Sequence, residues 1–194
     1  QDQLIRAWPA VQRSHPAARL VIVGAGSHGR TLRKLAAPLA DAVVFTGPLP
    51  AADLRSVLAA ADVFAMPART RGRGLDVEGL GIVYLEAQAC GTRVLAVRGS
   101  AVEETLEGES PQILASEPTP EALAASVLEA MRLPQRPQDR DARRARIVAQ
   151  FSHDRTYEQM LQLYRSVLAG RAGSNPAQPI PAAGNHGTRP AVSS

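Results

Sequence analysis

The stretch RLVIVGAGSHG, residues 19–29, decides the fold class of this chain. It opens with a continuous apolar run that ends at Gly24, and the segment after it, up to Leu39, has the pattern of a helix. A continuous apolar strand that leads through glycine into a helix is typical of a parallel sheet buried on both faces. The stretch therefore predicts the first strand–helix unit of an α/β protein.

The same alternation continues on both sides of this stretch. Strands are predicted at 43–46, 62–66, 93–97 and 112–115, and helices at 1–16, 51–60, 82–89, 102–106, 119–133, 139–150 and 153–168. Strands that alternate with helices predict a Rossmann-like, doubly wound parallel sheet with flanking helices over residues 1–168. Residues 169–194 are rich in Gly, Pro, Ser and Ala without periodicity, so they are predicted to form a disordered tail.

Composition narrows the class of partner. The chain has 194 residues and a net charge of +4, which suits phosphates or an anionic membrane surface. Basic residues are not interleaved with aromatics, so no nucleic acid is expected, and the run RDARRAR at 140–146 is interpreted as an exposed helix face. The single cysteine, Cys90, is expected to be a buried structural thiol. No apolar stretch reaches membrane-spanning length and the N-terminus is no signal peptide, so a cytoplasmic location is predicted.

The spacing Gly24, Gly26 and Gly29 matches a dinucleotide-binding turn. Such a site also needs an acidic residue about 20 positions further on to bind a ribose. Here the next strand ends in Phe-Thr-Gly-Pro at 45–48, which supplies no acid. An NAD-binding domain stays as an alternative, and so does a tight turn with only a structural role.

Two glutamates, Glu78 and Glu86, flank a glycine-rich loop that runs into a predicted helix. The amides of Gly81, Ile82 and Val83 would form the start of that helix, which is a favourable site for a diphosphate. Glu86 lies one turn further along and can accept hydrogen bonds from ribose hydroxyls, whereas Glu78 can face a sugar beyond the phosphates. In the alternative interpretation both glutamates are ordinary surface charges.

The stretch MPARTRGRGLDVEGLGIVYLEAQACG, residues 66–91, resembles glycosyltransferase family 4 of the two-Rossmann-domain (GT-B) type. It is most similar to the actinobacterial GDP-mannose-dependent phosphatidylinositol monomannoside mannosyltransferases. The resemblance implies the C-terminal, donor-binding half of a GT-B fold and retaining transfer of mannose from GDP-mannose, without a metal or other cofactor. It further implies a lipid acceptor, held by an N-terminal domain, and a peripheral position at the inner face of the membrane.

The resemblance also implies roles for individual residues. Glu78 would contact the donor sugar in catalysis, the segment Gly79, Leu80 and Gly81 would present amides to sugar and phosphate, and Glu86 would hold the ribose. The base would be received by the turn at Gly47 and Leu49 and by the loop at Met66 and Ala68. The chain departs from the family at RGSAVEE, 98–104, where a Gly-Gly-x-Pro-Glu turn is usual. The family also has an arginine and a lysine that bind the diphosphate just before the helix that begins here at Gln1, and this sequence does not contain them. We therefore expect no sugar transfer by this chain alone, and a non-catalytic nucleotide-sugar-binding module or a truncated remnant stays as an alternative.

Overall fold

The structure, a computed structural model, describes residues 1–67, 81–98, 106 and 113–173. The chain divides into two compact units, Gln1–Ser152 and a second that begins at His153. The described part of the second unit is the helix α7 (His153–Gly173), which continues past residue 168. Most of the predicted tail, 174–194, lies outside the described residues, as do 102–105 of the predicted short helix, so both stay predictions.

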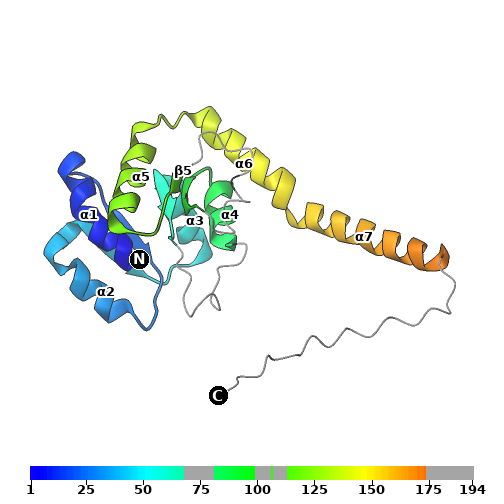
Figure 1. The fold of residues 1–194 in the computed structure, drawn as a ribbon, viewed down its shortest axis with the longest axis horizontal. Helices are drawn as coiled ribbons and strands as arrows, with labels where there is room; N and C mark the ends of the chain where they lie inside the picture. The colour runs from blue at the N-terminus through cyan, green and yellow to red at the C-terminus, as the bar shows by residue number, and fades with distance from the viewer. Residues whose placement is uncertain (68–80, 99–105, 107–112, 174–194) are drawn as a thin grey trace, which may run out of the picture. The chain divides into compact units, whose positions relative to one another are not determined.

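Helices and strands alternate along the first unit, as Figure 1 shows. They are α1 (Asp2–Ser14), β1 (Leu20–Val23), α2 (Gly29–Ala36), the 3-10 helix η1 (Ala37–Ala42), β2 (Val43–Gly47), α3 (Ala51–Ala60), β3 (Val63–Ala65), α4 (Ile82–Ala89), β4 (Arg93–Val97), β5 (Ile113–Ala115), α5 (Pro120–Arg132) and α6 (Pro137–Phe151). The bounds of α3, α4 and β4 are those predicted from the sequence. Pro9 lies inside α1, which continues through it.

Every strand pair in the described ranges is parallel. β1 pairs with β2, and β4 lies between β3 and β5. The described strands thus form two sheets, one of two strands and one of three. Because each parallel neighbour has to be reached by a crossover, helices are carried to the faces of these sheets. The predicted α/β class, with parallel strands and flanking helices, is confirmed.

Strand β4 is apolar after its first residue, the buried Arg93, and its packing explains this pattern. Leu95 and Val97 belong to a core that also contains buried residues of α1 and α5, and these two helices pack against each other. Val94 and Ala96 belong to a second core with α3 and with Tyr84 of α4. Side chains alternate between the two faces of a strand, so β4 is buried by helices on both sides.

The interpretation of 140–146 as an exposed helix face holds for 141–142 and 144–145 but is wrong for Arg143. Arg143 is only 5% exposed, and its guanidinium donates a hydrogen bond to the carbonyl oxygen of Gly91 at 2.8 Å. Arg144 donates from Nε to the carbonyl oxygen of Ala89 at 3.0 Å. The last carbonyl groups of a helix lack partners within that helix, and α6 supplies cationic donors to those of α4. Charge patterning along α6 could not reveal this contact, because its acceptors lie more than 50 residues away.

Cys90 follows α4 as a free, half-buried thiol that packs against the second core, less enclosed than predicted.

Helix α7 carries exposed apolar side chains. These are Tyr157, Met160, Leu163, Tyr164, Val167 and Leu168. Within the described ranges, none of the helices combines the length and the apolar character needed to cross a membrane.

Candidate functional site

The carboxyl ends of the parallel strands form one edge of the first unit, which is where α/β proteins bind ligands. β1 leads into Gly24, whose amide donates to the carbonyl oxygen of Gly47 at 2.8 Å. This bond joins the ends of β1 and β2. Met66 follows the end of β3, and Arg98 follows the end of β4, where it is exposed. The predicted base-binding positions Gly47 and Met66 therefore lie at carboxyl ends of strands.

Helix α4 begins at this edge with a conformation that favours glycine. Gly81 has φ 65° and ψ 62°, in the left-handed region, and its carbonyl oxygen accepts a hydrogen bond from the Tyr84 amide at 2.8 Å. Helix geometry leaves the amides of Ile82 and Val83 without an acceptor inside the helix. No acidic residue lies in this first turn, and Ile82 is 67% exposed. The start of α4 can therefore bind an anion, since its dipole and its amides favour negative charge.

Glu86 is exposed on the same helix, one turn after Ile82. Residues four apart lie on the same face of a helix, so the carboxylate stands beside the first turn and can accept hydrogen bonds from hydroxyl groups. A ligand with a diphosphate and a ribose could engage both features at once.

Tyr84 links α4 to the end of β3. The side chain is 1% exposed, its hydroxyl donates to the carbonyl oxygen of Met66, and its ring meets the Phe64 ring edge to face with the centroids 5.3 Å apart. Met66 is thereby held close to the start of α4. Sequence reasoning missed this role of Tyr84, although a tyrosine in the apolar stripe of a helix signals a hydroxyl that needs a partner.

The structure locates seven of the predicted site residues, which are Gly47, Leu49, Met66, Gly81, Ile82, Val83 and Glu86. Four others, Glu78, Gly79, Leu80 and Ala68, lie outside the described residues, as does 99–104 of the segment that departs from the family turn. Of the seven, Met66, Gly81, Ile82, Val83 and Glu86 are brought together by α4 and Tyr84. Gly47 and Leu49 belong to the β1–β2 side, where Gly24 is the partner of Gly47.

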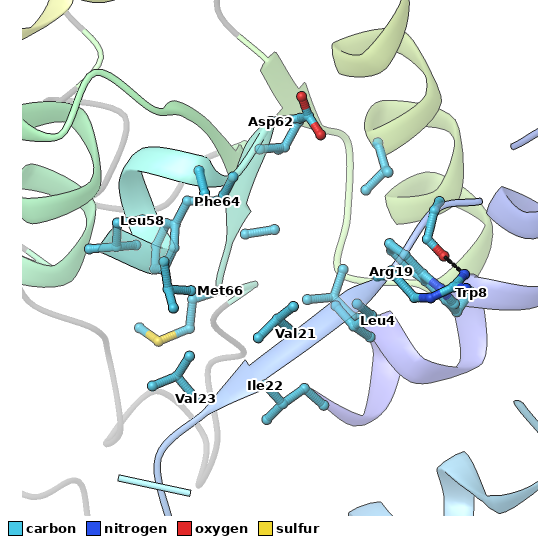
Figure 2. A pocket seen from close by; sticks show the side chains of 18 of the residues that line it. Leu4, Trp8, Arg19, Val21, Ile22, Val23, Leu58, Asp62, Phe64 and Met66 are labelled. Carbon is cyan, nitrogen blue, oxygen red and sulfur yellow. Dashed lines mark hydrogen bonds between the residues drawn. The ribbon is translucent and has the colours of Figure 1, made fainter. Parts of the chain in front are cut away.

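A cavity of about 610 Å³ lies between the two strand ladders. Figure 2 shows Val21 and Val23 of β1 and Phe64 and Met66 lining it. Val23 and Met66 place one end of the cavity at the carboxyl edge of the strands. Its walls are mostly apolar, with Gln1, Arg19 and Asp62 as polar lining residues, and they suit a flat ring or hydrocarbon better than a diphosphate. Sequence reasoning did not predict this cavity.

Metal ligands do not gather in the described part of the chain: no three His, Cys, Asp or Glu side chains there are grouped to hold an ion.

Comparison with protein families shows which family has this sequence pattern. The model of the family "Glycosyl transferases group 1" matches residues 1–132, about two thirds of the chain. The chain belongs to this family. The predicted membership in the glycosyltransferases is confirmed, and the matched region includes β1 to β4 and the start of α4.

This glycosyl transferase chain is similar over part of its length to mannosyltransferases. It is 57% identical over 106 residues to the GDP-mannose-dependent monoacylated alpha-(1-6)-phosphatidylinositol monomannoside mannosyltransferase of Corynebacterium glutamicum, covering 55% of this chain and 28% of the relative. It is 54% identical over 117 residues to the GDP-mannose-dependent alpha-(1-6)-phosphatidylinositol monomannoside mannosyltransferase of Mycolicibacterium smegmatis, covering 59% of this chain and 31% of the relative. The chain thus spans less than a third of these relatives.

Among solved structures, the sucrose-phosphate synthase of Thermosynechococcus elongatus matches with a TM-score of 0.67 and 26% identity. The match covers 87% of this glycosyl transferase chain and 43% of the synthase. The chain therefore corresponds to somewhat less than half of a glycosyltransferase of this fold, which confirms the prediction of one half of a GT-B fold.

Proposed function

We propose that the chain is the donor-binding half of a retaining glycosyltransferase that uses GDP-mannose. The observation that carries the proposal is the combination of three features at the start of α4. The amides of Ile82 and Val83 have no acceptor inside the helix, the first turn contains no acidic residue, and the carboxylate of Glu86 is exposed one turn later. The donor sugar is inferred from two mannosyltransferases named as GDP-mannose-dependent, to which the chain is 57% and 54% identical over more than 100 residues.

In the proposed complex, the amides of Gly79, Leu80 and Gly81 face the sugar and the phosphate next to it, and those of Gly81, Ile82 and Val83 bind the diphosphate. Glu86 accepts the ribose hydroxyls, and Glu78 contacts the mannose. The guanine would lie towards Gly47, Leu49, Met66 and Ala68, and the half-buried Met66 is held in place by Tyr84.

During transfer, the bond between the anomeric carbon and the diphosphate oxygen breaks, and a bond to the acceptor hydroxyl oxygen forms. Negative charge develops on the departing GDP as its bond breaks, and the diphosphate takes up the proton that the acceptor hydroxyl loses. The dipole of α4 and its amides stabilise this charge, and preorganised donors of this kind gain strength where water is excluded. No metal or other cofactor takes part in the proposed reaction.

The acceptor in the proposal is a phosphatidylinositol mannoside-type lipid at the inner face of the membrane. Both relatives named above are phosphatidylinositol monomannoside mannosyltransferases. Binding of the lipid is assigned to an N-terminal domain, so the proposal assigns only the donor to these 194 residues.

Isothermal titration calorimetry with GDP-mannose, UDP-glucose and NADH tests the proposal. We expect GDP-mannose to bind most tightly. Tighter binding of UDP-glucose would reject the assigned base and sugar, and tighter binding of NADH would favour a dinucleotide site at Gly24–Gly29 instead.

A further inference from the structure

Helix α6 supports the end of α4 that is remote from the candidate site. Its arginines donate hydrogen bonds to residues at the end of α4 and of α3: Arg143 to Gly91, Arg144 to Ala89, Arg146 to Gln88, and Arg140 to Ala59. Cations at a helix C-terminus satisfy carbonyl groups that lack intrahelical partners and interact favourably with the dipole. The arginines of α6 therefore fix the C-terminal end of α4.

One of these arginines also begins a path that reaches the candidate site. The Arg146 guanidinium donates to the side-chain oxygen of Gln88, and the Gln88 amide nitrogen donates to the carbonyl oxygen of Tyr84 at 3.3 Å. The Tyr84 hydroxyl donates in turn to the carbonyl oxygen of Met66. Gln88 and Tyr84 are 0% and 1% exposed, so this path runs through the interior.

Buried hydrogen bonds of this kind restrict movement, because each broken one leaves a polar group away from water. Helix α4 has 8 residues and is therefore about 12 Å long. If its C-terminal end moves by about 1 Å while the middle stays in place, its first turn moves by a similar amount. An N–H···O bond tolerates only about 0.5 Å between its usual limits, so a displacement of this size would break contacts to a phosphate.

We propose that Arg146 of α6 is a positioning residue for the donor. It acts through Gln88 and Tyr84 to hold the first turn of α4, at Gly81–Val83, in register with the diphosphate. This inference rests on the proposed function and adds to it a residue that touches neither the donor nor the acceptor.

The test compares the affinities of GDP and GMP for Arg146→Met, Arg146→Lys and the control Arg132→Met. Arg132 is an exposed arginine in the last turn of α5. GDP differs from GMP by the phosphate assigned to the start of α4, so the ratio of their dissociation constants reports on that contact. A fall in the fraction of folded protein would change the measured stoichiometry and leave this ratio unchanged.

We expect Arg146→Met to reduce the preference for GDP over GMP by about tenfold, the size of one lost charged hydrogen bond. Arg146→Lys retains a cationic donor and is expected to recover part of the preference, and Arg132→Met to keep all of it. Gln88→Met should reduce the preference for GDP by a similar factor. The double variant with Arg146→Met and Gln88→Met should lose no more of this preference than either single variant. An unchanged ratio in folded Arg146→Met would overturn the proposal.

Amide hydrogen exchange in the ligand-free chain separates this inference from the proposed function. The Tyr84 amide, bonded to Gly81 at 2.8 Å, is expected to exchange faster in Arg146→Met than in the unmodified chain. Equal rates would overturn the positioning role. If exchange is faster in Arg146→Met but the unmodified chain does not distinguish GDP from GMP, then Arg146 does stabilise α4. In that case only the diphosphate site is rejected.

Discussion

Gly91 is the residue where a single added methyl group should reveal how tightly α4 and α6 are joined. It follows α4 with φ +79°, in the left-handed region that favours glycine. The Gly91 amide donates to the carbonyl oxygen of Gln88 at 2.8 Å, and the Thr92 amide donates to that of Ala87 at 3.0 Å, which closes the helix. A Cβ at Gly91 would lie 3.1 Å from the Arg140 Cβ and 3.2 Å from the Arg140 carbonyl oxygen.

Three contributions set the expected cost of Gly91→Ala. The left-handed conformation costs alanine about 1–2 kcal/mol. The close approach to Arg140 involves backbone, which cannot rotate away, and adds about 1 kcal/mol as mild overpacking. Reduced freedom of the unfolded chain returns about 0.4–1 kcal/mol. The net loss is about 1–2.5 kcal/mol, which corresponds to a fall of about 2–10 °C in melting temperature for a chain of this size.

Thermal unfolding followed by circular dichroism measures this loss, and Gly29→Ala is the matched control. A Cβ at Gly29 meets nothing within 4 Å, and Gly29 opens α2 without a positive φ. Alanine in a helix is favoured over glycine by about 0.5–1 kcal/mol, so the control should melt at the same or a higher temperature. The reasoning is refuted if Gly91→Ala melts within 1 °C of the unmodified chain, about the error of the measurement.

Other predictions concern the donor and helix α7. Glu86→Ala should weaken GDP binding in calorimetry by about 1–3 kcal/mol, the cost of a lost charged hydrogen bond, and unchanged affinity would reject the ribose assignment. Glu78→Gln should leave GDP affinity intact and weaken GDP-mannose, whereas an equal loss for both ligands would remove Glu78 from the sugar. Exposed Leu163 and Tyr164 should cause self-association, so a variant with both changed to Glu should sediment more slowly in ultracentrifugation at high concentration. The 194 residues alone should form no mannolipid from radiolabelled GDP-mannose, because positioning an acceptor supplies about 7–11 kcal/mol; robust product would contradict this.

Local patterns predicted the elements of the fold well. The strand at 93–97 is recognisable because a strand covered on both faces is mostly apolar, and only its first residue, the buried Arg93, is charged. The apolar run at 20–23 also forms a strand, but Val21 is 43% exposed, so β1 is less covered than the run predicts. The glycine-rich loop before α4 signals a tight entry into a helix, and Gly81 adopts the left-handed conformation that such an entry uses. The start of α4 could therefore be chosen as an anion site before its geometry was known.

Contacts between distant segments could not be predicted in the same way. The acceptors of Arg143 and Arg144 lie at Gly91 and Ala89, and nothing in the spacing of the arginines identifies them. The bond from Tyr84 to Met66 depends on how far β3 extends, and the cavity between the ladders depends on a pairing that sequence periodicity does not report. Periodicity describes which face of an element is buried, whereas the partner on that face is a property of the assembled fold.

Binding of a nucleotide diphosphate at the start of α4 can be observed by backbone amide NMR of the isotopically labelled chain during titration with GDP. We expect the amide resonances of Ile82 and Val83 to shift by far more than those of Ser27 and Gly29 at the start of α2. GMP should cause a smaller shift at the same two positions. Shifts confined to the Gly24–Gly29 turn, with Ile82 and Val83 unmoved at saturation, would contradict binding at the start of α4.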